Sequence, residues 1–240
     1  MKQYLRLLKK KRLPTTWCPG CGIGIAVKAL AKSMYELKLS RKNTVIISGI
    51  GCTGRSAGYF NLDTVHTLHG RAVAVAEGIK FANPKLNVIV LSGDGDIAGI
   101  GGNHLLHSSR RKTPIKIICV NNNIYGMTGG QVSPTTPLEK TTMSTPEGNQ
   151  YPPIDMQCLA NDNYYARSTV FHVKHLKNMI KAAIEYKDFA LVEVVSNCYQ
   201  NFGKKNGFTH PYEMLMYFKD NFKIKSAPGI LKKGELGSTK

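Results

Sequence analysis

The fold of this chain is indicated most clearly by residues 88–95, Val88-Ile89-Val90-Leu91-Ser92-Gly93-Asp94-Gly95. Four consecutive apolar residues stand directly before a glycine-rich turn that carries a carboxylate. A short apolar run bounded by turn residues is typical of a strand buried on both faces. The stretch therefore predicts a central strand of a covered sheet, with Asp94 at its carboxyl end.

Other parts of the chain repeat this pattern. Similar apolar, β-branched runs occur at residues 44–47, 115–120 and 190–195. Helix-like segments lie between the runs, at residues 22–37, 71–82, 102–110 and 175–186. The alternation predicts an α/β fold, a parallel sheet with helices on both faces. We expect one domain over residues 1–225, because α/β domains of this size often do not divide, and a flexible tail over residues 226–240.

Three of the predicted strands end in turns rich in glycine or asparagine, at residues 48–51, 92–95 and 121–123. Open parallel sheets bind ligands at the carboxyl ends of their strands, so the three turns should meet at one site. A loop over residues 128–153, rich in Thr, Pro and Gly, follows the third turn. Loops of this length in compact domains are often functional, and we expect this one to be a lid.

The turn at Asp94 has the residue types of a magnesium site. Gly93 and Gly95 flank the carboxylate, which would let the backbone approach a ligand closely. Magnesium prefers oxygen ligands, and Asn122 at the end of the next strand would offer an amide oxygen. One crossover helix and one strand separate the two residues, so their turns should be neighbours. Gly-Asp-Gly alone also occurs in ordinary turns, but its joint occurrence with Asn122 favours a metal site.

The chain is strongly basic, with a formal net charge of +18. Such a molecule attracts anions, and nucleic acid, diphosphate cofactors, coenzyme A and an acidic redox partner are all candidates. The basic run at residues 9–12 would suit an anionic partner. No apolar run approaches the roughly 20 residues of a membrane helix, and residues 1–14 lack the apolar block of a secretory signal. We therefore expect a cytoplasmic protein without a membrane partner.

Six cysteines in such a chain argue against a disulfide framework. Cys18 and Cys21 form a Cys-x-x-Cys pair, whose spacing alone is compatible with zinc, a redox dithiol or an iron–sulfur cluster. Cys52 and Cys198 follow predicted strands, close to the expected ligand site. The remaining two are expected to be plain core residues, Cys119 and Cys158.

A histidine-containing segment is predicted to open the helix at residues 71–82. Its sequence is His66-Thr67-Leu68-His69-Gly70-Arg71. Unpaired backbone amides at a helix start bind anions, and histidine and arginine side chains add donors. A lone histidine is more often a surface or core residue, but the position of His69 before the helix favours a functional role.

Together these motifs resemble the β subunits of the 2-oxoacid:ferredoxin oxidoreductases over nearly the whole chain. The Gly-Asp-Gly and Asn-Asn elements also look like the thiamine-diphosphate motif of transketolases and pyruvate decarboxylases. The more specific matches are Cys-Pro-Gly-Cys-Gly from residue 18, Gly-Ile-Gly-Cys from residue 49, His-Thr-Leu-His-Gly-Arg-Ala from residue 66, Gly-Asp-Gly-Asp from residue 93, Asn-Asn-Asn-Ile-Tyr-Gly-Met-Thr-Gly-Gly-Gln from residue 121, and Cys198. Two features depart from the family: a short tail, and Asn197 where proline is expected.

The resemblance implies a thiamine-diphosphate-binding fold and three cofactors. It implies that Mg²⁺ is held by the side chains of Asp94 and Asn122 and the carbonyl of Ile124. By the same resemblance, one [4Fe–4S] cluster has as ligands Cys18, Cys21, Cys52 and Cys198. The other contacts implied for thiamine diphosphate are Ile50, Gly51, Cys52, Thr53, His66, Leu68, His69, Gly70, Arg71, Gly95, Asp96, Gly126 and Met127.

The activity implied is the oxidative decarboxylation of a 2-oxoacid to an acyl-coenzyme A, with electrons passing through the cluster to ferredoxin. The glutamate that activates the thiamine ring is expected on a partner α subunit, so no catalytic residue is assigned to this chain. Further γ and δ subunits are possible partners. Residues 125–131 look more like those of 2-oxoglutarate or branched-chain enzymes than those of pyruvate enzymes, and we expect 2-oxoglutarate.

Several alternatives stay open at this point. Pyruvate or a branched-chain 2-oxoacid is an alternative substrate. A thiamine-dependent decarboxylase or synthase without a cluster is another alternative, in which the cysteines are incidental or bind zinc. A nucleic-acid-binding protein with a zinc-bound Cys-x-x-Cys would explain the basic charge. That interpretation leaves the pairing of Asp94 with Asn122 without a role, so we expect no nucleic-acid partner.

Overall fold

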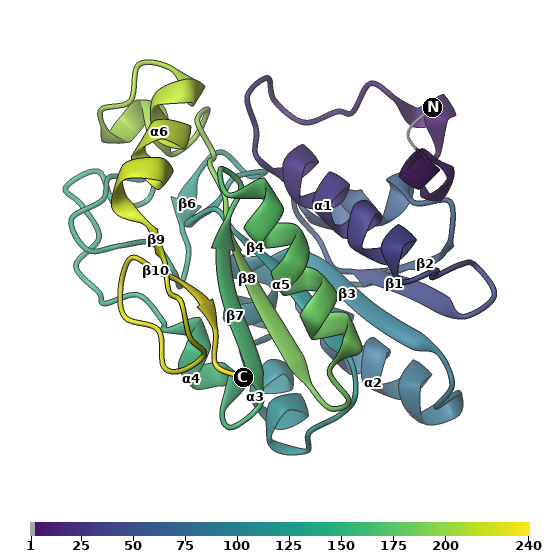
Figure 1. Cartoon of the computed structure of the whole chain (residues 1–240). Helices are drawn as coiled ribbons and strands as arrows, with labels where there is room; N and C mark the ends of the chain where they lie inside the picture. Colours follow the sequence, from purple (N-terminus) through teal and green to yellow (C-terminus); the bar gives the residue numbers. More distant parts are fainter. Residues whose placement is uncertain (1–2) are drawn as a thin grey trace.

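The computed structural model describes residues 3–240, so the first two residues of the expected domain lie outside the described part. An eight-stranded sheet has the strand order β2-β1-β3-β4-β8-β7-β10-β9 (Figure 1). The strands from β2 to β7 run parallel, whereas β10 pairs antiparallel with β7 and parallel with β9. Their bounds are β1 (Thr44–Ser48), β2 (Asp63–His66), β3 (Asn87–Gly93), β4 (Lys116–Asn121), β7 (Tyr164–Thr169), β8 (Ala190–Val195), β9 (Lys223–Ile224) and β10 (Glu235–Ser238).

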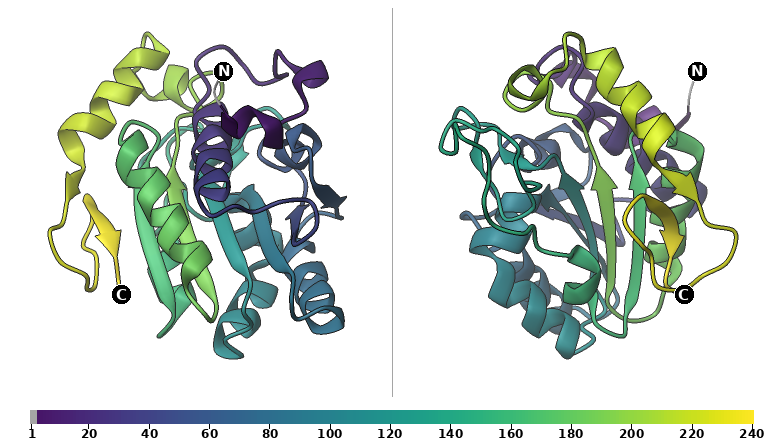
Figure 2. Two further views of the ribbon diagram at one scale, coloured as in Figure 1. Left: turned by 45° about the vertical axis from the view of Figure 1, so that its right-hand side comes forward. Right: turned by 90° about the vertical axis from the view of Figure 1, so that its left-hand side faces the viewer.

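Helices cover both faces of the sheet (Figure 2). One face carries α1 (Ile23–Glu36) and α5 (Val173–Glu185), and α6 (Pro211–Asn221) adds Phe218 to the same apolar cluster. The other face carries α2 (Ala72–Ala82), α3 (Gly102–Arg110) and α4 (Met156–Ala160). Short 3₁₀ turns are at Gln3–Leu7, Lys10–Arg12, Gly54–Tyr59 and Gly203–Asn206, with one π-helical turn at Gly95–Ile100. Within residues 3–240 no helix has the length and apolar character that crossing a membrane requires.

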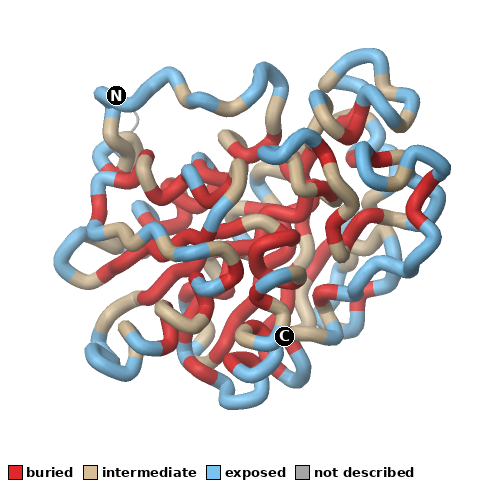
Figure 3. Tube along the Cα trace, turned by 180° about the vertical axis from the view of Figure 1, so that it is seen from behind, coloured by how far each residue is buried: buried red, intermediate tan, exposed pale blue. Residues whose placement is uncertain are grey.

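The central strands form because every residue in them is shielded from water. All residues of β1, β4 and β8 are buried, and the buried trace runs through the middle of the molecule (Figure 3). Parallel strands covered on both faces need continuous apolar runs, and these strands supply them. The predicted α/β fold, with its parallel sheet and two helical layers, is confirmed. Strands β2 and β7 were not predicted, because their mixed sequences, Asp-Thr-Val-His and Tyr-Tyr-Ala-Arg-Ser-Thr, contain no such run.

The tail over residues 226–240 was expected to be flexible, and this expectation is wrong. In β10, Gly237 pairs with Arg167 of β7, and the backbone N–H of Thr239 donates to Tyr165 O at 2.8 Å. Leu231 and Leu236 are buried under the same edge of the sheet. The local composition of the tail gives no strand signal, because the pairing edge and the apolar surface both come from residues about 70 positions earlier in the chain.

We predict that Leu236→Ala lowers the free energy of unfolding by about 2–4 kcal/mol, because it removes a fully buried side chain and leaves a cavity. The matched control is Ile230→Ala in the same tail, where the side chain is 77% exposed and the change should stay within about 0.5 kcal/mol. Urea denaturation of both variants measures the difference. Equal stability of the two variants would contradict the docked tail.

Candidate functional site

The strand-end turns meet at the carboxyl edge of the sheet, where β1, β3 and β4 are neighbours. They surround a small cavity of about 90 Å³. Of the residues expected to contact Mg²⁺ or thiamine diphosphate, those that line the cavity are Ile50, Gly51, Cys52, Thr53, His69, Asp94, Gly95, Asp96, Asn122, Ile124, Gly126 and Met127. Gly93, which was expected to flank the Asp94 carboxylate, also lines the cavity, and so do Tyr125 and Thr128, which were not among the expected cofactor contacts. Sequence separation between the turns reaches about 75 residues, so only the sheet topology unites them.

Four other expected contacts do not line this cavity. His66 ends the edge strand β2, and its Nδ1 lies 2.9 Å from Ser48 Oγ. Leu68 is 78% exposed, and Arg71 is an exposed residue at the start of α2. Gly70 contributes its backbone N–H to another residue of the site, as described below. The segment over residues 66–71 therefore brings one side chain, that of His69, to the cavity wall.

Asp94 is a buried carboxylate that hydroxyl groups hold in place. Its Oδ2 accepts hydrogen bonds from Ser133 Oγ at 2.8 Å and Thr135 Oγ1 at 2.6 Å. Both hydroxyls belong to the loop over residues 128–153, so this loop is tied to the Asp94 carboxylate. Burial raises the pKa of Asp94, and the two hydrogen bonds offset part of that rise. No Lys, Arg or His among residues 3–240 forms an ion pair with Asp94, so its charge has no protein counterion.

The metal ligands expected next to Asp94 face it closely. One terminal atom of the Asn122 amide lies 3.2 Å from Asp94 Oδ1 and 2.8 Å from Ile124 O. With nitrogen at that position the amide donates to both atoms; with oxygen there, three oxygens converge, which is favourable only around a cation. Octahedral Mg²⁺ places neighbouring ligand oxygens about 2.9 Å apart. The donor set therefore fits Mg²⁺ in both chemistry and spacing.

Asp96 organises the turns around the cavity. Its Oδ1 accepts from the backbone N–H groups of Gly70 at 2.8 Å and Ile50 at 3.1 Å, and its Oδ2 accepts from Ser92 Oγ at 2.7 Å. His69 Nδ1 lies 2.7 Å from Asp96 Oδ1 but makes no hydrogen bond in this orientation. Asp96 lines the cavity as expected, but both of its oxygens are engaged by the protein. Its observed contacts join the turns after β1, β2 and β3.

The role expected for Gly95 differs from the one that the structure supports. We expected its missing side chain to let a ligand approach, but a Cβ at Gly95 would lie 2.2 Å from Cε1 of Tyr125. The Tyr125 hydroxyl also donates to Gly95 O at 3.0 Å. Glycine is therefore needed here for the packing of the Tyr125 ring, which forms one wall of the cavity. At Gly93 a Cβ would meet no atom closer than 3.6 Å.

A second cavity, of about 380 Å³, lies beside the first. Four cysteines line it: Cys18, Cys21, Cys52 and Cys198. The two cavities share wall residues, namely Cys52, Asn122, Gly126 and Met127. A Cβ at Gly126 would lie 3.4 Å from Cys198 Sγ and 3.9 Å from Cys52 Sγ, so this residue forms a thin partition. The structure thus brings the four thiols to one cavity next to Asp94.

The spacing of the four thiols bears on the kind of metal. Across residues 3–240, no three His, Cys, Asp or Glu side chains are close enough to hold one metal ion. Zinc draws its ligands to about 2.3 Å, whereas each thiolate of a four-iron cluster binds a different iron atom and stays farther from the others. Burial, with a smaller contribution from the neighbouring thiols, raises the pKa of Cys21 to about 12 and that of Cys198 to about 11. Binding of a metal at this cavity would therefore displace protons.

Residues next to the cysteines in sequence hold this cavity together. Trp17 Nε1 donates to Cys52 O at 2.8 Å. Asn197, which stands where the family pattern has proline, donates from Nδ2 to Gly20 O at 2.7 Å. Asn197 thus links the Cys-x-x-Cys loop to the segment that carries Cys198. We expected Cys119 to be a core residue, and it is buried in β4. The same expectation for Cys158 is wrong, because its side chain is exposed on α4.

Comparison with known proteins shows the family to which this chain belongs. Residues 49–194 match the model of the thiamine pyrophosphate enzyme, C-terminal TPP binding domain. The chain is 44% identical over 221 residues to 2-oxoglutarate synthase subunit KorB of Methanothermobacter thermautotrophicus, covering 91% of this chain and 77% of that protein. KorB of Methanocaldococcus jannaschii is also 44% identical, over 92% of this chain and 83% of the relative. The chain belongs to the β subunits of the 2-oxoacid:ferredoxin oxidoreductases.

A solved structure extends this family likeness to the fold of the β subunit. A chain of 2-oxoglutarate:ferredoxin oxidoreductase from Magnetococcus marinus, a structure with 2-oxoglutarate, coenzyme A and succinyl-CoA bound, has a TM-score of 0.87 and 30% identity. The match covers 98% of this β subunit and 84% of that chain. The thiamine-diphosphate-binding fold and the family predicted from the motifs are both confirmed.

We predict that Gly95→Ala lowers the free energy of unfolding by about 1–3 kcal/mol, because the new methyl group overlaps the Tyr125 ring. The control is Gly78→Ala in the middle of α2, where a Cβ meets no atom within 4 Å. That change should be neutral or stabilise by up to about 1 kcal/mol, because alanine favours helices. Thermal unfolding of the two variants decides the matter: a Gly95→Ala variant as stable as Gly78→Ala would rule out this packing role.

Proposed function

We propose that this β subunit acts in the oxidative decarboxylation of 2-oxoglutarate to succinyl-coenzyme A, with ferredoxin as electron acceptor. The observation that carries the proposal is a buried carboxylate, Asp94, which has no counterion among residues 3–240 and lies in a cavity that adjoins a cavity lined by four cysteines. Two relatives named as 2-oxoglutarate synthase subunits and a neighbour with 2-oxoglutarate bound support this choice of substrate.

In this proposal Asp94, Asn122 and the carbonyl of Ile124 would hold Mg²⁺, whose charge would offset that of the diphosphate of the thiamine cofactor. Their spacing, their burial and the missing counterion support the assignment. Thiamine diphosphate supplies a stabilised carbanion equivalent for decarboxylation. The chain's own residues would orient the cofactor. Ser133 and Thr135 fix the Asp94 carboxylate, and the Tyr125 ring forms a wall that excludes water.

We assign the second cavity to a [4Fe–4S] cluster held by the four cysteines that line it. Such a cluster supplies one-electron transfer between the thiamine site and ferredoxin. The shared wall residues Cys52 and Gly126 support this role, because a thin partition keeps the path for electrons short. The basic run Lys9 to Arg12 lines an open surface cavity together with Arg6, which suits an acidic partner such as ferredoxin.

The α subunit is proposed to complete the active site. The first cavity, of about 90 Å³, is much smaller than the 300 Å³ or more that ligands of cofactor size occupy. No glutamate lines it among the described residues, although thiamine chemistry needs one. Apolar side chains at its wall are partly exposed, Ile50 by 38% and Met127 by 42%. Exposed apolar residues beside an incomplete cavity are expected where a partner subunit docks.

The test of this function is co-expression with the α subunit and anaerobic purification. We expect reduction of a viologen dye that depends on 2-oxoglutarate and coenzyme A. Faster reduction with pyruvate or a branched-chain 2-oxoacid would change the substrate, and decarboxylation without dye reduction would favour the cluster-free alternative. A complex that acts on none of these acids would overturn the enzyme class.

We predict that Asp94→Asn abolishes the retention of Mg²⁺ and thiamine diphosphate, because the three proposed protein ligands lose their carboxylate, while the iron content is unchanged. The control is Asp63→Asn, which removes an exposed carboxylate paired with Arg41 on the surface. Thiamine diphosphate stabilises a protein that binds it, so the wild type and the control should unfold at a higher temperature with the cofactor. Cofactor-dependent stabilisation of Asp94→Asn equal to that of the wild type would refute the metal assignment.

We predict that Cys198→Ser lowers the iron bound per chain and the visible absorbance near 400 nm, because the cluster loses one of four thiolate ligands. Cys158→Ser is the matched control, since that thiol is exposed on α4 and does not line the cavity. Iron analysis and absorbance spectra of the anaerobic proteins make the comparison. Stoichiometric zinc in a colourless wild-type protein would contradict the cluster.

A further inference from the structure

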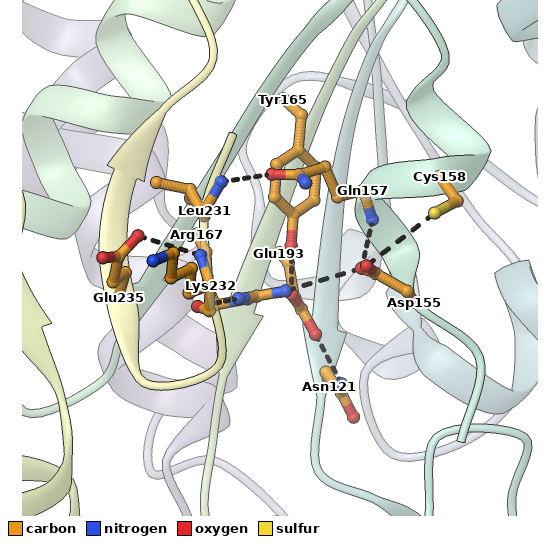
Figure 4. A network of polar contacts seen from close by, with 10 residues as sticks. All are labelled: Asn121, Asp155, Gln157, Cys158, Tyr165, Arg167, Glu193, Leu231, Lys232 and Glu235. Carbon is orange, nitrogen blue, oxygen red and sulfur yellow. Dashed lines mark hydrogen bonds and ion pairs between the residues drawn. The ribbon is translucent and has the colours of Figure 1, made fainter. Parts of the chain in front are cut away.

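A largely buried ion pair joins Glu193 to Arg167, and Glu193 also contacts Asn121 (Figure 4). Glu193 in β8 is buried, and its Oε2 accepts from Arg167 Nε at 2.7 Å and from the Tyr165 hydroxyl. Its other oxygen, Oε1, accepts from Asn121 Nδ2 at 2.7 Å. Burial alone would raise the pKa of Glu193, but the charge of Arg167 and these hydrogen bonds hold it below its ordinary value. The carboxylate is therefore ionised and offers acceptors only.

The ionised carboxylate fixes which way the Asn121 amide points. An amide has a donor end and an acceptor end, and only the donor end is favourable against Glu193 Oε1. The acceptor end, Asn121 Oδ1, then faces the opposite side. There it accepts from the backbone N–H of Asn123 at 3.1 Å and lies 2.9 Å from Thr135 Oγ1.

The acceptor end of Asn121 contacts two groups, Asn123 N–H and Thr135 Oγ1, that help to position the three proposed magnesium ligands. Asn123 has a left-handed backbone, with φ of 63°, and it stands between the ligands Asn122 and Ile124. A hydrogen bond to its N–H stabilises this strained turn, as asparagine side chains do for the backbone two residues on. The Thr135 hydroxyl also lies 2.6 Å from Asp94 Oδ2, so its one proton is shared between Asp94 and Asn121.

We propose that Glu193 is a positioning residue for the magnesium site and acts through the Asn121 amide. The inference rests on the proposed binding of Mg²⁺ and thiamine diphosphate. A buried ion pair contributes little to stability compared with apolar residues, so orientation is the better account of its presence. Glutamine at this position would not fix the amide, because it presents both a donor and an acceptor. Ion pairing with Arg167 keeps position 193 an acceptor.

Contacts to the two oxygens of Glu193 allow the positioning role to be tested separately from a purely structural role. Tyr165 contacts Glu193 Oε2, on the side away from Asn121, whereas Asn121 contacts Oε1. Removing the Tyr165 hydroxyl weakens the buried network but leaves the hydrogen bond to Asn121 in place. Removing the Asn121 amide breaks the link to the metal ligands. The variants Tyr165→Phe and Asn121→Ala therefore perturb the same carboxylate with different consequences for Mg²⁺.

The experiment measures the Mg²⁺ concentration that gives half-maximal thiamine diphosphate binding, by titration calorimetry on the full chain in complex with its α subunit. Loss of outer-shell partners of metal ligands weakens affinity about 10–100-fold, so Asn121→Ala should need at least about tenfold more Mg²⁺. Glu193→Gln should shift in the same direction. Tyr165→Phe should lower the unfolding temperature without cofactor but keep the wild-type Mg²⁺ requirement.

The outcomes distinguish this inference from the function on which it rests. A wild-type complex that binds no thiamine diphosphate with Mg²⁺ overturns the proposed function and this inference with it. Wild-type binding with an unchanged Mg²⁺ requirement in Asn121→Ala overturns the positioning role alone. If Tyr165→Phe raises the Mg²⁺ requirement as much as Asn121→Ala does, the positioning role is also overturned. The requirement would then reflect the overall stability of the protein and not the orientation of the Asn121 amide. If Glu193→Gln fails to fold, the comparison of Asn121→Ala with Tyr165→Phe still tests the positioning role.

Discussion

The burial of one carboxylate at the carboxyl edge of the sheet, that of Asp94, constrains the whole site. Removing a charge from water costs several kcal/mol unless other charges or hydrogen bonds replace the lost hydration. Two hydroxyl groups of the loop over residues 128–153 supply part of that replacement, so the loop is tied to the site. The amide of Asn122 and the carbonyl of Ile124 bring further oxygens, which makes a divalent cation the favoured partner.

Two of the buried carboxylates near the site, Asp94 and Glu193, have opposite surroundings. Glu193 has a protein counterion, Arg167, at 2.7 Å, whereas Asp94 forms no ion pair within residues 3–240. The first arrangement gives a fixed acceptor that orients neighbouring groups. The second leaves a charge for a metal to neutralise. Asn121 and Thr135 join the two carboxylates through side-chain contacts. The position of the Glu193 carboxylate therefore affects the groups that contact Asp94.

In the proposed function, the proximity of the two cavities couples a thiamine site to an electron-transfer site. Many thiamine enzymes share the arrangement around Asp94, but here Cys52 and Gly126 belong to the walls of both cavities. The missing side chain of Gly126 keeps the partition thin, since a Cβ there would approach two of the four sulfurs within 4 Å. The small size of the first cavity and the exposed Ile50 and Met127 beside it agree with a site that a partner completes.

The sequence alone determined the central strands, the helical layers, the family and the residues around Asp94, because apolar runs and short motifs act locally along the chain. It did not reveal the docking of β10 or the exposure of Cys158, since these depend on surfaces that distant segments provide. It also assigned Gly95 to ligand approach, whereas the Tyr125 ring fills that space. Only the tertiary structure joined Glu193 to the proposed magnesium ligands, because that link passes through side chains from three separate parts of the chain.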